Sequence, residues 1–250
     1  MRIVHNTVQD FYAGKTDTND MGSVAKFHSE GCDEAECEMS VLGMIVAATH
    51  TTATAIYVTF VYILSTPMVY VRLKEEIAQA VKNGTISSPI TDSEIKSMLY
   101  LQAVVLEGLR MLPPAPTREP KLVPPEGETL QDRFIPGGTT ISHNTYALMR
   151  DQRIFGPDAE LFRPERYLQA DKNKISPDMK AQVELCFGHG QWGCMGKQIA
   201  MMDLHKLLFE LFRAFDMQLL HPGSDVLNLD QECAFLFKDL WVQVQETRAF

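Results

Sequence analysis

The sequence predicts a mainly α-helical fold with one small β-hairpin region. Three observations lead to this prediction. Apolar residues recur at the spacing of one helix face over long stretches. Proline and glycine end these stretches sharply, and strand-favouring residues gather mainly within 127–144. The length suits one large domain, so we expect a single domain over residues 1–250, with a poorly ordered start over 1–20.

Composition and charge narrow the class of protein. The chain is 45% hydrophobic and 22% charged, as in globular proteins rather than disordered chains or fibres. Lys plus Arg number 23 against 32 Asp plus Glu, giving a net charge of -9. Such a chain repels a phosphate backbone, so we expect no nucleic-acid partner. The 5 cysteines, an odd number, favour a reducing compartment over a disulfide framework.

Residues 42–64 form a long apolar stretch, close to the ~20 residues that cross a bilayer. The polar residues 49–52 interrupt its middle, where unpaired polar groups would be costliest in lipid. We therefore predict a long central helix buried inside the protein and no membrane span, with a span as the less favoured alternative. Ala47 and Ala48 carry little side-chain bulk and precede the threonines at 49, 51 and 52. These residues either form a groove lined by hydroxyl groups or simply pack against a neighbouring element.

Local signals place two further helices. The first begins at Thr66, which proline follows, and ends at the Asn-Gly pair 83–84. The second begins at Thr91, because Glu94 stands three residues later at the capping-box spacing. It ends at the proline pair 113–114, since proline cannot continue a helix.

The β-structure is expected between residues 127 and 144, as a hairpin around the Pro-Gly-Gly turn at 136–138. Residues 151–193 are rich in Pro, Gly, Asp and Arg and show little periodicity. Long irregular segments inside compact domains are usually functional, so we expect this one to wrap a site. The helical period returns after Cys194.

The sharpest candidate site is the segment 187–196, in which glycines flank Cys194 and let the backbone approach a ligand closely. The positive end of the helix expected after it favours an anionic sulfur, the form that binds metal. A buried structural cysteine is the plainer alternative. Zinc is the weaker metal interpretation, because the spacing of Cys186, His189 and Cys194 is unlike the paired C-x2-4-C units of structural sites.

Glu107 and Arg110 lie three residues apart on one helix face among apolar neighbours. Such a pair usually belongs to a solvated face. The apolar surroundings indicate burial here, and a buried guanidinium needs a further partner. We expect Arg166 to join this pair.

Four sequence pieces, in this order, resemble the cytochrome P450 family, and most closely its fungal microsomal members of secondary metabolism. The pieces are residues 47–52 for [AG]-G-x-[DE]-T-T, Glu107 and Arg110 for E-x-x-R, residues 162–166 for F-x-P-E-R, and Phe187, Gly190, Cys194 and Gly196 for F-x-x-G-x-R-x-C-x-G.

The resemblance implies that residues 187–196 are a haem-binding loop. Cys194 would then be the thiolate axial ligand of the iron in haem b, an iron protoporphyrin. Phe187, Gly190 and Gly196 would bind the cofactor by shaping the surroundings of the sulfur.

The resemblance also assigns roles outside this loop. Glu107, Arg110 and Arg166 would form a structural ionic triad. Thr51 would act in catalysis, through the hydroxyl that steers protons to iron-bound oxygen.

Three residues depart from the family pattern. Trp192 stands where the signature has an arginine that pairs with a haem propionate, so we expect Arg118 or Lys121 to supply that charge. Ala48 replaces a glycine. His50 replaces an acid, and because imidazole relays protons near neutral pH, we expect proton delivery that is altered rather than lost.

The resemblance covers the chain from about residue 21 but only the C-terminal half of a full family member, and it implies the C-terminal portion of the cytochrome P450 fold. The expected function is a haem-thiolate monooxygenase that inserts one atom of O2 into a small lipophilic substrate, with electrons from NADPH-cytochrome P450 reductase. The alternative is a non-catalytic fragment that does not bind haem stably. The expected location is the cytosolic face of the endoplasmic reticulum membrane, or the cytoplasm for an anchorless chain.

Overall fold

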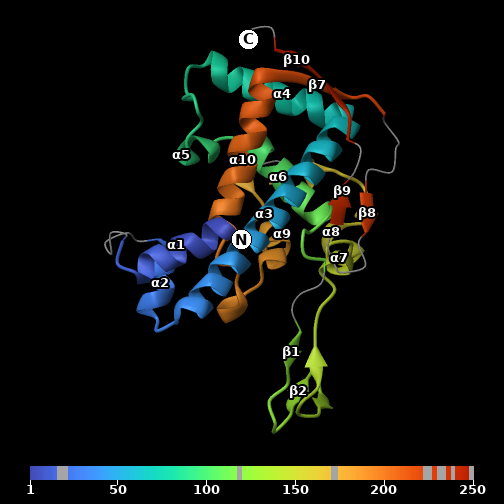
Figure 1. Cartoon of the computed structure of the whole chain (residues 1–250). Helices are drawn as coiled ribbons and strands as arrows, with labels where there is room; N and C mark the ends of the chain where they lie inside the picture. The colour runs from blue at the N-terminus through green and yellow to red at the C-terminus, as the bar shows by residue number, and fades with distance from the viewer. Residues whose placement is uncertain are drawn as a thin grey trace. The chain divides into compact units, whose positions relative to one another are not determined.

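The computed structural model describes residues 1–15, 22–116, 120–169, 174–221, 227–229, 235–237 and 240–247. The fold is mainly α-helical with short antiparallel strand pairs, which confirms the predicted class (Figure 1). The α-helices are α1 (Arg2–Tyr12), α2 (Ser23–Ser29), α3 (Glu34–Ser65), α4 (Pro67–Lys82), α5 (Asp92–Ile95), α6 (Leu99–Met111), α7 (Thr145–Leu148), α8 (Gln152–Phe155), α9 (Pro177–Glu184) and α10 (Lys197–Ala214).

The remaining elements are short. The 3-10 helices are η1 (Pro164–Tyr167), η2 (Leu185–Phe187) and η3 (Gly190–Trp192). The strands pair two by two, all antiparallel, in the part of the chain that the structure describes. The pairs are β1 (Lys121–Leu122) with β4 (Thr140–Ile141), β2 (Glu128–Leu130) with β3 (Arg133–Ile135), β5 (Leu168–Gln169) with β6 (Lys174–Ile175), β7 (Phe215–Leu219) with β10 (Val242–Glu246), and β8 (Leu227–Leu229) with β9 (Phe235–Phe237).

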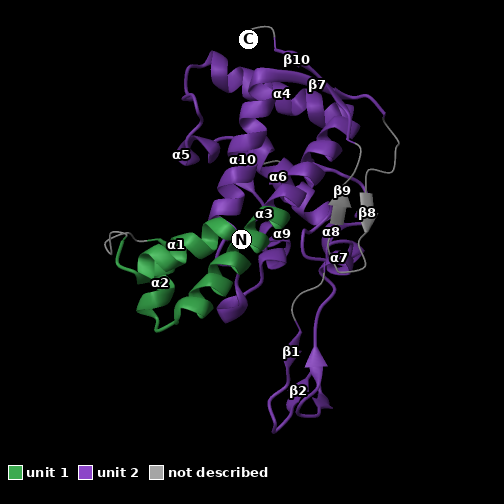
Figure 2. Cartoon of the chain, viewed as in Figure 1, with its two compact units in different colours: residues 1–51 green, residues 52–250 purple. Residues whose placement is uncertain are grey.

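The chain divides into two compact units, residues 1–51 and residues 52–250 (Figure 2). The first unit holds α1, α2 and the first part of α3, around a small core of Val4, Val8 and Cys37. The expectation of a poorly ordered start is wrong over Arg2–Tyr12, which form a helix. The reason is that Val4 and Val8 lie one turn apart, so a helix buries both on one face.

Helix α3 is longer at its start than the predicted 42–64. Asp33 and Glu36 form a reciprocal cap, in which each side chain accepts the backbone N–H of the other residue at 2.9–3.0 Å. This cap lets the helix begin at Glu34. Its most apolar 18-residue window has a mean hydropathy of 1.5 and is 17% buried, so the prediction of a helix buried inside the protein holds only for a minority of its residues, such as Ala55 and Thr59, and is wrong for the rest. Apolar side chains such as Val46 stand exposed.

By length and composition alone, α3 qualifies as a candidate membrane span. Core helices of soluble proteins pass the same test, so this observation is weak evidence.

The core of the second unit surrounds α6, whose residues are almost all buried. Helices α4 and α10 pack on α6 and on each other, as their adjacent ribbons show (Figure 1). Helix α4 follows Thr66 and ends at Asn83-Gly84 as predicted, with Gly84 in the left-handed region (φ 65°).

The helix predicted to run from Thr91 to the prolines is instead two helices, α5 and α6. The predicted capping box of Thr91 and Glu94 is present. Beyond it, the Ser97 hydroxyl donates to the Glu94 carbonyl at 2.7 Å, and α6 starts afresh because Glu76 of α4 caps it. The Glu76 carboxylate accepts the backbone N–H groups of Tyr100 and Leu101 at 2.7 and 2.9 Å.

The predicted hairpin region contains one complete strand pair, β2 with β3, and the strand β4, which pairs with β1 outside the region. The tight turn joins β2 to β3 at Gln131 and Asp132, which both have positive φ (48° and 62°). The Pro-Gly-Gly stretch 136–138 connects β3 to β4 instead. A glycine is needed at Gly137, since a Cβ there would lie 2.3 Å from the Pro125 carbonyl oxygen.

Candidate functional site

Glu107, Arg110 and Arg166 meet in the core of the second unit, as predicted. Arg110 donates to Glu107 through Nε and Nη2 at 2.8 and 2.9 Å, and Arg166 Nε donates to Glu107 Oε1 at 3.0 Å. The side chains of Glu107 and Arg110 are completely buried. Burial alone would lower the pKa of Arg110, but hydrogen bonds and charge from Glu107 outweigh it and raise the pKa. The cluster is therefore ionic.

The two guanidinium groups also hold the irregular segment that precedes η1. Arg110 Nη1 donates to the carbonyls of Met149 and Ala159, both at 2.7 Å. Arg166 donates to the carbonyls of Phe155 and Asp158 at 2.5 and 3.1 Å. Three carbonyls of the segment expected to wrap a site, those of Phe155, Asp158 and Ala159, are thus satisfied by this cluster.

One member of the cluster escaped the sequence analysis. The Tyr167 hydroxyl donates to Glu107 Oε2 at 2.9 Å, and its residue is fully buried. Burial, and then the charge of Glu107, raises the pKa of Tyr167 well above its ordinary value. The available signal was an aromatic residue with a polar tip directly after Arg166, since a buried tyrosine hydroxyl needs a partner.

The segment 187–196 folds into a closed loop between η2 and α10. The Cys194 N–H donates to the Phe187 carbonyl at 2.6 Å, which closes the loop. Gly188 (φ 78°) and Gly190 (φ 59°) take left-handed conformations that side chains disfavour. The loop shape explains why glycines stand at these two positions.

Cys194 lies exposed just before α10. Its chain neighbours Trp192, Met195 and Ile199 are apolar, yet they are 53%, 78% and 62% exposed. A Cβ at Gly196 would lie 3.8 Å from Cys194 Sγ, an ordinary van der Waals contact, so the space beside the sulfur does not itself require this glycine. A soft sulfur donor beside uncovered apolar side chains fits a large, flat, lipophilic group that carries a metal. The residues present therefore fit haem.

The zinc alternative lacks its donor set. Cys186 is buried while Cys194 is exposed. Among the described residues, no three His, Cys, Asp or Glu side chains come together as metal ligands.

Lys121, one of the two residues expected to replace the missing arginine, lies beside Trp192. Its Nζ is 5.4 Å from the centroid of the Trp192 ring. This cation–π contact places a positive charge at the residue that occupies the arginine position. Arg118, the other candidate, lies outside the described residues.

His50 and Thr51 lie on α3, in the first compact unit. The Thr51 hydroxyl donates to the Ala47 carbonyl one turn earlier at 2.7 Å, as a mid-helix threonine commonly does. His50 is half-buried. Their catalytic roles stay predictions.

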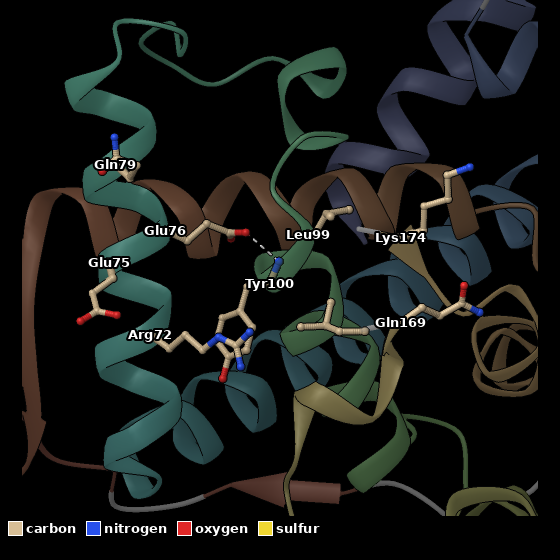
Figure 3. A pocket seen from close by; sticks show the side chains of 9 residues that line it. Arg72, Glu75, Glu76, Gln79, Leu99, Tyr100, Gln169 and Lys174 are labelled. Carbon is tan, nitrogen blue, oxygen red and sulfur yellow. Dashed lines mark hydrogen bonds between the residues drawn. The ribbon is translucent and has the colours of Figure 1, made fainter. Parts of the chain in front are cut away.

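A cavity of about 580 Å³ lies beside the start of α6, apart from the predicted site residues (Figure 3). Arg72 lies over the Tyr100 ring at 4.4 Å and pairs with Glu165 at 3.0 Å. The Tyr100 hydroxyl donates to the same Glu165 at 2.8 Å, and Glu76 is occupied by the cap of α6. Arg72 and Glu76 are thus engaged by other groups of the protein.

These features define a class of mainly helical proteins with two common elements. An exposed cysteine precedes a long helix, and a buried ionic cluster binds the backbone of an irregular segment earlier in the chain. The sequence model of one family of this class, described as Cytochrome P450, matches residues 6–245. The chain belongs to the cytochrome P450 family.

The similar proteins are fungal and confirm the resemblance. "Cytochrome P450 monooxygenase aba1" of Botryotinia fuckeliana is 46% identical over 226 residues, covering 90% of this chain and 44% of that protein. "Cytochrome P450 monooxygenase abl1" of Leptosphaeria maculans is 43% identical over 216 residues (85% and 37%). "Pisatin demethylase" of Fusarium vanettenii is 34% identical over 203 residues (81% and 37%). The chain spans less than half the length of these relatives.

Proposed function

We propose that this chain is the haem-binding part of a monooxygenase that inserts one atom of O2 into a small lipophilic organic substrate, in fungal secondary metabolism. The observation that carries the proposal is Cys194, exposed at the start of α10 and flanked by uncovered apolar side chains. The names of the fungal relatives as monooxygenases support the reaction class.

Cys194 would hold the iron of haem b as its thiolate axial ligand. Thiolate-bound haem supplies the oxygen activation, because the sulfur donates electron density to the iron. Helix α10 begins at Lys197, three residues after Cys194, and the positive dipole end of a helix this close in sequence would favour the anionic form of the ligand. Phe187, Gly190 and Gly196 keep the loop in the shape that presents it.

Lys121 would balance the charge of a haem carboxylate. Its ammonium lies over the Trp192 ring, where the family signature has an arginine. A lysine is a compact point charge without the planar fork of arginine, so it would form a less directional pair. Arg118 is the second candidate for this role.

Thr51 and His50 would deliver protons. The Thr51 hydroxyl donates a hydrogen bond to the Ala47 carbonyl, which leaves its oxygen lone pairs free to accept a hydrogen bond from the group that carries the proton. His50 would supply this proton, since an imidazole can act as both proton donor and proton acceptor.

The electron donor would be NADPH-cytochrome P450 reductase, and the location the cytosolic face of the endoplasmic reticulum membrane. Both proposals come from the family. The apolar helix α3 adds only weak support for contact with a membrane.

Haem reconstitution tests the proposal. The purified chain is supplied with haem, reduced and exposed to carbon monoxide, and the expected result is the strongly red-shifted Soret band of thiolate ligation. Cys194→Ala should abolish this band. Cys32→Ala is the matched control, because Cys32 is a thiol of the first unit outside the loop, and it should keep the band.

The alternative function is a non-catalytic P450 fragment that does not hold haem. The low burial of α3 favours it, since uncovered apolar surface promotes association in place of ligand binding. The absence of the band under all reconstitution conditions would support this alternative and overturn the proposed reaction.

A further inference from the structure

An ion pair joins the two ends of the Cys194 loop. Lys197 is the first residue of α10, and its Nζ lies 2.9 Å from Oε2 of Glu184, the last residue of α9. The same Nζ is 5.9 Å from the centroid of the Phe187 ring. One ammonium group thus pairs with the helix before the loop and lies at the outer limit of cation–π distance from the first aromatic residue of the loop.

Each charge of this pair sits at the unfavourable end of its own helix. A cation at a helix N-terminus and an anion at a helix C-terminus both oppose the helix dipole. The first turn of α10 contains no acidic residue that would offset Lys197. The two charges compensate each other only while the ends of α9 and α10 stay together, so the pair links the geometry of the two ends.

We infer that Lys197, with Glu184 and Phe187, forms a clamp that positions Cys194. The clamp works on the backbone: it holds Phe187, whose carbonyl accepts the Cys194 N–H at 2.6 Å. Lys197 is therefore a positioning residue rather than a catalytic one. The inference rests on the proposed role of Cys194 as the iron ligand.

Hydrogen exchange of the Cys194 amide, measured on the chain without haem, tests the clamp directly. Lys197→Met should speed exchange of this amide about three- to tenfold, because the loop opens more often. Lys197→Arg keeps the charge and should restore slow exchange. Lys180→Met is the matched control, since Lys180 pairs with the same Glu184 at 3.8 Å but lies on α9, outside the loop.

The double variant Glu184→Lys with Lys197→Glu exchanges the two charges. It distinguishes attraction between the two side chains from the effect of each charge on the dipole of its own helix. The exchanged charges sit at the favourable ends of their helices and still attract each other, so the double variant should protect the Cys194 amide as the wild type does. Glu184→Lys alone and Lys197→Glu alone each place two like charges together, so each should speed exchange of the Cys194 amide. Equal exchange in the wild type, Lys197→Met and both single reversals would overturn the clamp.

The haem-bound chain supplies the second readout. Lys197→Met should lower the fraction of the red-shifted Soret band, and Lys197→Arg should restore it. A wild-type band that Lys197→Met leaves unchanged would overturn the clamp while the proposed function stands. No band in any variant, with amide exchange still dependent on Lys197, would overturn the proposed function instead.

Discussion

The Tyr167 hydroxyl donates a hydrogen bond to Glu107 Oε2 at 2.9 Å, inside a cluster from which water is excluded. The opposite oxygen, Oε1, accepts from Arg110, Arg166 and the Arg163 backbone N–H. Both oxygens of the carboxylate are therefore engaged, and the buried charges are satisfied from several directions.

Tyr167→Phe removes only this hydroxyl and keeps the ring that fills the core. We expect a loss of about 1.5–3 kcal/mol in the free energy of unfolding, the usual range for a hydrogen bond to a charged group. Urea unfolding followed by far-UV circular dichroism measures it. An unchanged midpoint would contradict a stabilising role for the hydroxyl.

Glu107→Gln removes the charge that both guanidinium groups face. The loss should be larger, about 3–5 kcal/mol, because it leaves the buried Arg110 without its carboxylate partner, while Arg166 keeps Asp158. Glu75→Gln on the exposed face of α4 is the control and should change stability by no more than about 0.5 kcal/mol. If both variants unfold at the same urea concentration, the cluster does not hold the core.

Gly108→Ala probes the contact between α6 and the second part of α3. A Cβ at this position would lie 2.0 Å from the buried Thr59 Oγ1, so the helices must separate, at a cost of about 1–3 kcal/mol. Gly43→Ala is the matched control, since no atom lies within 4 Å of a Cβ there and alanine favours the helix. Thermal melts should therefore move in opposite directions for the two variants, and a shared direction would contradict the close contact.

The buried His205 of α10 should make stability fall in mild acid. Its Nδ1 lies 2.6 Å from the Met201 carbonyl oxygen, and its buried Nε2 has no hydrogen-bond partner in the part of the chain that the structure describes. Burial is the main cause that lowers its pKa from 6.5; Lys180 lowers it further, and Asp92 acts in the opposite direction.

A histidine whose pKa is lower in the folded than in the unfolded state binds protons preferentially when unfolded. Its contribution to stability is therefore present above pH 6.5 and is lost as the pH falls from there toward the folded-state pKa. Melting temperatures at pH 7.5 and 5.5 measure the effect. His205→Leu should narrow the difference between the two, and an equal difference in both proteins would refute the role of His205.

The sequence predicted correctly those caps and ion pairs that depend on residues close together in the chain. The capping box at Thr91 and the closeness of Glu107 to Arg110 depend on spacings of three residues, and both are present. Arg166 is present as predicted, but it joins through Glu107: its Nε donates to Glu107 Oε1, while the further acceptors of Arg110 are the carbonyls of Met149 and Ala159.

The features that sequence reasoning missed depend on tertiary contacts. The break before α6 arises because Glu76, on another helix, caps it. The turn at Gln131 and Asp132 lacks the glycine that usually signals positive φ. Strands β7 and β10 pair although residues 220–241 separate them in the sequence, and no local pattern predicts such a pairing.

The bonds from Arg110 to the carbonyls of Met149 and Ala159 have a consequence during synthesis on the ribosome. Helix α6 emerges first, and its arginine lacks these acceptors until about fifty further residues have been translated. A nascent chain that stalls in this interval carries a cation that it cannot bury without cost. The central helix of the second unit therefore completes its packing only after η1 has left the exit tunnel.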